Sequence, residues 1–167
     1  MSGSGLLDNI AAIARRFDRD VLESRNGAIA QNEAFSTDRL DRARRYILEN
    51  PPPPELRIQT MAAAGSLARL DASAESDLDL IVTTEENETP AVIHDALIQW
   101  REALCVAIEM QNSNPDGVFA YPVSHAQICK SAGKSDEDYG DVAKRVLILL
   151  ESTWLFNEHE YWPAPEG

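Results

Sequence analysis

The sequence is short of the residues that mark disulfide-rich and zinc-binding proteins. It has two cysteines, Cys105 and Cys129, which lie far apart without a CxxC spacing, and its three histidines form no metal-ligand pattern. Neither a disulfide framework nor a zinc site is therefore indicated. Cysteine usage of this kind is typical of a reducing compartment, so we expect a cytoplasmic protein.

Long apolar runs and basic residues are also scarce. No run approaches the roughly 18 to 20 residues of a membrane span, and the N-terminus lacks a basic region followed by an apolar one, so we expect no membrane partner. With 15 basic against 28 acidic residues, the formal charge is -13. Extended nucleic acid is a poor partner for such a chain, whereas a single nucleotide is compatible with it because a divalent cation can neutralise the phosphates.

What is present suits one compact domain, since the 167 residues are 44% hydrophobic. Apolar residues recur at three- and four-residue steps from Leu6 to about Gln31, which predicts an amphipathic helix. A second helix is expected after Ser36 or Thr37. It must stop before the prolines at 51–54, which indicate a stiff, extended connector. Residues 1–54 are thus expected to form a helical pair and a spacer.

The pattern of apolar and polar residues changes after the prolines. Residues 56–64 alternate and then become continuously apolar, which predicts a buried strand that Gly65 breaks. Residues 78–83 predict the next strand. A polar loop at 85–89 follows, and a helix is expected to open at Pro90 and run to about Leu104.

The C-terminal part is harder to assign. Residues 105–110 could prolong the preceding helix or form a third strand, and the alternation of Val106, Ile108 and Met110 favours the strand. Residues 117–123 predict a fourth strand at a sheet edge, because Pro122 cannot donate a hydrogen bond. A helix is expected over 141–158, and residues 159–167 are a tail. The aromatic residues near this end suit a core or an interface: Trp154, Phe156, Tyr161 and Trp162.

An aspartate pair stands at the start of the second predicted strand. Residues two apart on a strand face the same side, so Asp77 and Asp79 should point together while Leu78 and Leu80 point to the other face. Two carboxylates about 6 to 7 Å apart at their backbones repel each other by about 2 to 3 kcal/mol at an effective dielectric constant near 20. A cation would remove this repulsion. Mg²⁺ suits it, since it takes one or two carboxylates and completes its shell with water and phosphate oxygens.

The pair Gly65-Ser66 directly follows the first predicted strand. Glycine lets a backbone approach a phosphate closely, and the amides at a following helix start can hydrogen-bond phosphate oxygens together with the Ser66 hydroxyl. A helix cap uses the same geometry, so Ser66 could serve either purpose.

Together these residues resemble a known family. The stretch Gly65-Ser66-Leu67-Ala68-Arg69, with Asp71, followed by Ser76-Asp77-Leu78-Asp79, is similar to the signature of the DNA polymerase β-like nucleotidyltransferase superfamily. It is closest to the branch of glutamine synthetase adenylyltransferase and the signal-protein uridylyltransferases of nitrogen regulation. Ala68 departs from the second glycine of that signature, and Asp71 stands where glutamate is usual. The resemblance covers roughly residues 56–158, with specificity only in 65–82.

The resemblance implies an α+β fold with a small mixed sheet flanked by helices over residues 55–158. It also implies transfer of a nucleoside monophosphate from a nucleoside triphosphate to a hydroxyl of a protein, small molecule or nucleotide, with two Mg²⁺ ions held by Asp77 and Asp79. Gly65, Ser66, Arg69 and Ser76 would bind the nucleotide. The family's third carboxylate sits on a later strand, where Glu109 is the positional candidate.

Other interpretations stay open from the sequence. The aspartate pair could be a solvated strand start, and Arg69 could pair with Asp71 or Glu75 instead of a phosphate. The chain could be an inactive nucleotide sensor, or a regulatory, antitoxin-like interaction module. It could also be part of a longer enzyme, with an additional helical domain or a homo-oligomer completing the site.

Overall fold

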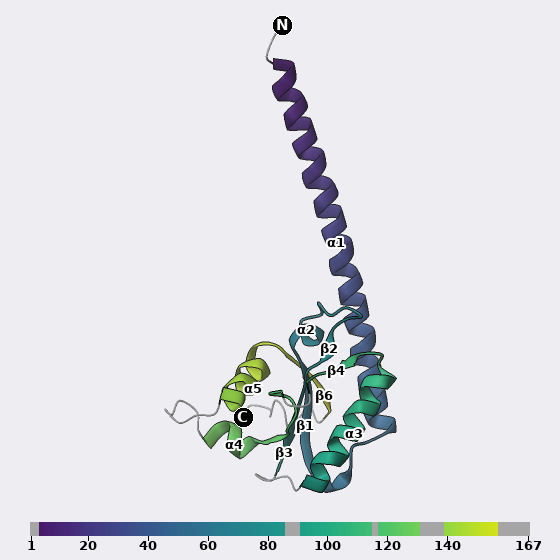
Figure 1. Cartoon of the computed structure of the whole chain (residues 1–167), viewed down its shortest axis with the longest axis vertical. Helices are drawn as coiled ribbons and strands as arrows, with labels where there is room; N and C mark the ends of the chain where they lie inside the picture. The colour runs from purple at the N-terminus through teal and green to yellow at the C-terminus, as the bar shows by residue number, and fades with distance from the viewer. Residues whose placement is uncertain (1–3, 86–90, 115–116, 131–138, 157–167) are drawn as a thin grey trace, which may run out of the picture.

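The computed structural model describes residues 4–85, 91–114, 117–130 and 139–156. It is a mixed α/β fold in which helices pack on both sides of a four-stranded mixed sheet (Figure 1). The helices are α1 (Ser4–Glu49), the 3-10 helix η1 (Pro54–Leu56), α2 (Gly65–Ala68), α3 (Ala91–Ala107), α4 (His125–Lys130) and α5 (Tyr139–Leu150). The strands are β1 (Ile58–Ala64), β2 (Asp77–Leu78), β3 (Leu80–Thr84), β4 (Gln111–Asn112), β5 (Val123–Ser124) and β6 (Ser152–Phe156).

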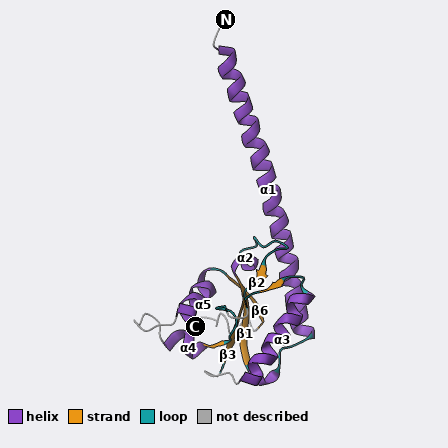
Figure 2. Cartoon of the chain, viewed as in Figure 1, coloured by secondary structure: helices purple, strands orange, loops and turns teal. Residues whose placement is uncertain are grey.

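The main sheet has the order β5-β3-β1-β6. Strand β1 pairs antiparallel with both β3 and β6, while β5 runs parallel to β3. The C-terminal part of α1 and α3 lie on one side of this sheet, with α4 and α5 on the other (Figure 2). Because both faces are covered, the last five residues of β1 are all buried, which explains why the last four of them, residues 61–64, are all apolar.

One hydrophobic core joins the N-terminal helix to the sheet. Leu40, Ala43 and Ile47 of α1 are nearly fully buried and pack in the same cluster as Met61 and Ala63 of β1. The C-terminal half of α1 is therefore part of the domain that carries the sheet. No helix in the described segments is both long and apolar enough to cross a membrane.

The predicted pair of N-terminal helices is wrong, because α1 is one continuous helix of 46 residues. Neither Ser36 nor Thr37 starts a new helix. The Thr37 hydroxyl donates to the carbonyl of Glu33 one turn earlier, and the buried Ser36 hydroxyl accepts a hydrogen bond from the amide of Ala72. With no proline before residue 51, nothing in the chain forces the helix to end.

The proline connector is only partly extended. Pro54 opens the 3-10 helix η1, and Pro52 is buried. Proline fixes its own φ near a helical value, which makes it a favourable first residue of a helical turn.

Two predicted elements near the C-terminus also differ. The helix predicted over 141–158 ends at Leu150, and Ser152–Phe156 forms β6, an outer strand of the sheet that pairs with β1. Of the strand predicted over 117–123 only Val123 lies in the sheet, at the edge that was expected. Before it, the amides of Gly117 and Ala120 bond to carbonyls three residues earlier, as in turns. Tyr161 and Trp162 lie outside the described residues.

Candidate active site

The turn after β1 is built around Gly65. Its φ is +62°, in the left-handed region that favours glycine, and α2 begins at this residue. A Cβ atom placed on Gly65 would lie 2.7 Å from Oδ2 of Asp79. Only a residue without a side chain therefore lets the turn and this carboxylate come so close. Of the acid pair, Asp79 is therefore the member that lies against the glycine-serine turn.

The two aspartates lie directly before β3, on either side of Leu78 in the sequence. Asp77 is exposed and lies in β2, whereas Asp79 is half-buried and stands between β2 and β3. The carbonyl of Asp79 accepts a 2.8 Å hydrogen bond from the amide of Ala64, the last residue of β1. Leu78 and Leu80 are fully buried, as predicted, whereas a common face for the two aspartates stays a prediction. The continuous strand predicted at 78–83 is instead two short strands in separate sheets.

The carboxylates influence each other electrostatically. The pKa of Asp79 is raised to about 6, first by burial and then by the negative charge of Asp77, while Arg69 acts in the opposite direction. A folded protein that holds Asp79 ionised near neutral pH therefore bears a free-energy cost. A divalent cation shared by the two carboxylates would remove it, and oxygen ligands of this kind fit Mg²⁺.

Arg69 is held by acidic neighbours. Its Nε atom donates to Asp71 at 3.1 Å, and its Nη1 atom bonds to Glu151, which lies between α5 and β6. These bonds raise its pKa. Of the pairings predicted for Arg69 the structure has the one with Asp71. The Glu151 partner was not foreseen, because it lies 82 residues away and depends on the pairing of β6 with β1.

Ser76 closes a short turn next to the pair. Its hydroxyl accepts from the amide of Ser73 at 3.0 Å, and its own amide donates to the Ser73 carbonyl. These bonds fix the chain as it enters Asp77. A nucleotide-binding role for Ser76 stays a prediction.

Glu109 does not lie on a strand, so that part of its assignment is wrong. Helix α3 continues through Ala107, and Glu109 follows in a left-handed turn with φ +54°. Its carboxylate accepts hydrogen bonds from Arg39 at 2.8 Å and Arg42 at 3.2 Å, both on α1. The bond from Arg42 is the main cause of its lowered pKa.

The alternation of Val106, Ile108 and Met110 misled the strand prediction. The amide of Met110 bonds back to the carbonyl of Cys105, which closes the helix, and Ile108 and Met110 are buried in the core after that closure. The same apolar residues therefore bury the C-terminal end of a helix in the core and do not form a strand.

The strand that pairs with Asp77 of the acid pair carries side-chain amides and no third carboxylate. In the pairing of β2 with β4, Asp77 is opposite Gln111 and Leu78 is opposite Asn112. Within the described segments no group of three or more histidine, cysteine or acidic side chains could hold a metal ion. The two aspartates thus fit one Mg²⁺ whose remaining ligands come from water and phosphate, and they offer fewer protein ligands for a second ion.

Cys105 lies behind the site and takes no visible part in it. Burial raises the pKa of its thiol to about 11, and the nearby charge of Asp77 acts in the same direction. A protonated, buried thiol is neither a nucleophile nor a metal ligand at neutral pH.

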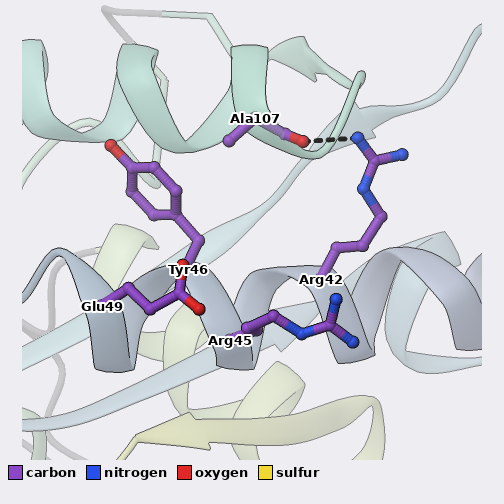
Figure 3. A pocket seen from close by; sticks show the side chains of 5 residues that line it. All are labelled: Arg42, Arg45, Tyr46, Glu49 and Ala107. Atoms are coloured by element: carbon purple, nitrogen blue, oxygen red, sulfur yellow. Dashed lines mark hydrogen bonds between the residues drawn. The ribbon is translucent and has the colours of Figure 1, made fainter.

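A separate shallow pocket lies between α1 and the end of α3 (Figure 3). It has a volume of about 170 Å³ and is lined by Arg42, Arg45, Tyr46, Glu49 and Ala107. Arg42 is already engaged, since its Nη2 atom donates to the Ala107 carbonyl at 2.6 Å. None of the residues predicted for the nucleotide site lines this pocket.

Comparisons of the chain with protein-family models, with curated proteins and with solved structures find no match. The resemblance to the nucleotidyltransferase superfamily therefore depends on the sequence at residues 65–82 alone.

Proposed function

We propose that this chain is a metal-dependent nucleotidyltransferase, which transfers a nucleoside monophosphate from a nucleoside triphosphate to a hydroxyl of a protein, small molecule or nucleotide. One observation carries the proposal. The carboxylate of Asp79 lies against the Gly65 turn, at a distance that no other residue at position 65 would allow. The turn proposed to bind phosphate and one carboxylate of the proposed metal site thus lie side by side, as this chemistry requires.

Each residue has a defined task in this proposal. Asp77 and Asp79 hold Mg²⁺, and Gly65 and Ser66 bind the triphosphate through backbone amides and the Ser66 hydroxyl. When bound, Mg²⁺ neutralises phosphate charge and lowers the pKa of the attacking hydroxyl. The charge of Arg69 lowers the pKa of Asp79, and in this proposal its guanidinium binds a phosphate in exchange for Asp71 or Glu151.

The test follows a label from the α-phosphate of each triphosphate to candidate acceptors, in the presence of Mg²⁺. We expect transfer by the native chain and none by Asp77→Asn with Asp79→Asn. The matched control is Glu33→Gln with Glu55→Gln, two exposed glutamates elsewhere that lose the same charge. Equal transfer by the aspartate variant would disprove the proposal.

A second candidate is a nucleotide sensor or regulatory module that binds a triphosphate with Mg²⁺ without transferring it. The observation that favours it is the amide of Gln111 opposite Asp77, together with the engagement of Glu109 by Arg39 and Arg42. Calorimetry combined with a pyrophosphate assay separates the two functions. Binding that needs Mg²⁺ but releases no pyrophosphate over hours would support the sensor.

A further inference from the structure

The N-terminal part of α1 extends away from the rest of the described chain as a single helix (Figure 1). Residues 26–31 are exposed throughout, and a Cβ added to Gly27 would meet no atom within 4 Å. Among the residues of α1 whose side chains the structure describes, the first hydrogen bond to the domain is at Asn32, whose side chain donates to the carbonyl of Asp71. At 1.5 Å per residue, residues 4–31 form a rod about 40 Å long.

The spacing of apolar residues along this rod is that of a helix with one apolar face. The sequence has apolar residues at three- and four-residue steps, and in a helix these positions fall along one line. They are Leu6, Ile10, Ile13, Ala14, Phe17 and Val21. Isolated helices are marginal in water, and most gain their stability by packing an apolar face. A rod of this composition therefore needs a partner along that face.

The charge of the rod identifies the kind of partner. Residues 4–31 contain four arginines and four acidic residues, so their formal charge is zero, and the whole charge of -13 belongs to residues 32–167. Two rods therefore do not repel each other, although two domains do. The balanced charge also disfavours a membrane surface, since helices that bind there carry mostly basic residues on their polar face.

We propose that the apolar face of residues 6–21 binds the same face of a second copy of this chain, with the two helices antiparallel. A two-fold dimer uses one surface twice, so a single apolar line is sufficient. The antiparallel orientation sets the two acidic domains at opposite ends of the helix pair. Their separation then exceeds the Debye length of about 8 Å at physiological salt, whereas parallel helices would place them side by side.

Sedimentation of the full chain, from low micromolar to several hundred micromolar concentration, tests the dimer. We expect a dimer whose dissociation constant rises more than about 100-fold in Ile13→Asp with Phe17→Asp, because each copy then buries two unpaired charges. The matched control, Ala12→Asp with Asn26→Asp, adds the same charge on the opposite side of the helix and should stay dimeric. A monomeric native chain, with or without binding to anionic lipid vesicles, would overturn the proposal. So would equal effects of the two variants.

A distance between spin labels tests the orientation. A label on Asn26→Cys should give about 40 Å between copies when antiparallel helices are centred between Ile13 and Ala14. Parallel helices would give about 20 to 25 Å, because Asn26 lies on the outer side of each helix and the reach of two labels adds to the interaxial distance, and this result would contradict the arrangement. All labelled chains carry Cys129→Ser, and the chain with this change alone is the labelling control, since Cys105 is buried.

Discussion

At the scale of single residues, Asp79 combines a partly buried carboxylate with a like charge close by. Burial and the charge of Asp77 both favour its protonated form, and the nearby Arg69 only partly compensates. A group of this kind lowers the stability of the metal-free fold at neutral pH, and a bound cation reverses the effect. The pH dependence of stability therefore reports on the site directly.

The metal-free protein should become less stable as the pH rises through the interval between 3.8 and about 6, the ordinary and the raised pKa of Asp79. Below this interval the carboxyl is protonated in both states, and above it the folded state alone bears the cost of the charge. Asp79→Asn should remove this loss and raise the free energy of unfolding at pH 7 by about 1 to 2 kcal/mol, allowing for partial exposure. Urea unfolding with a chelator, at several pH values, measures both. An unchanged slope in the variant would show that Asp79 is not the responsible group.

Gly65 is the second residue of the site whose role can be measured, because its backbone conformation and its contact with Asp79 both exclude a side chain. Gly65→Ala should cost about 1 to 2 kcal/mol for the left-handed backbone. It should also displace the Asp79 carboxylate, because the new Cβ would lie 2.7 Å from its Oδ2 atom. We expect a lower Tm and a loss of Mg²⁺-triphosphate affinity of about tenfold or more. Gly27→Ala is the control, since open space surrounds that glycine, and it should leave the affinity unchanged.

At the scale of elements, one buried hydrogen bond ties α1 to the loop that leads to the acid pair. The Ser36 hydroxyl, fully buried, accepts from the amide of Ala72 at 3.1 Å. Ser36→Ala should leave that amide without a partner and lower the free energy of unfolding by about 1 to 3 kcal/mol. Thr37→Ala, an exposed neighbour on the same helix, should change it by less than about 0.5 kcal/mol. Equal changes in denaturant unfolding would mean that the bond contributes nothing.

The elements that the sequence predicted are those with local signals. Short apolar runs bounded by glycine or polar residues predicted strand β1, the turn at Gly65 and strand β3. The same pattern placed the acid pair at the start of the second predicted strand. The start of α3 after Pro90 belongs to the same class.

The elements that were missed depend on partners far along the chain. Strand β6 has a helix-like spacing of apolar residues, and only its pairing with β1, about 90 residues earlier, makes it a strand. Ser36 looks like a helix start until Ala72 provides its partner. Glu109 looked like a strand residue because apolar residues alternate around it, while the arginines that hold it lie far away on α1. No short-range pattern contains these contacts.

At the scale of the whole molecule, charge decides how a triphosphate can bind. Residues 32–167 carry a formal charge of -13, so they repel an anionic nucleotide unless a cation neutralises its phosphates. We therefore predict that the affinity for a nucleoside triphosphate is lost when Mg²⁺ is removed. A site that used a basic surface instead would bind the triphosphate without metal.

The most direct measurement is calorimetric titration of a non-hydrolysable nucleoside triphosphate into the full chain, with and without Mg²⁺. We predict binding that requires Mg²⁺, that disappears in Asp77→Asn with Asp79→Asn, and that persists in Glu33→Gln with Glu55→Gln. Binding of equal strength in the aspartate variant, or in the absence of Mg²⁺, would contradict the assignment of this acid pair as the metal site.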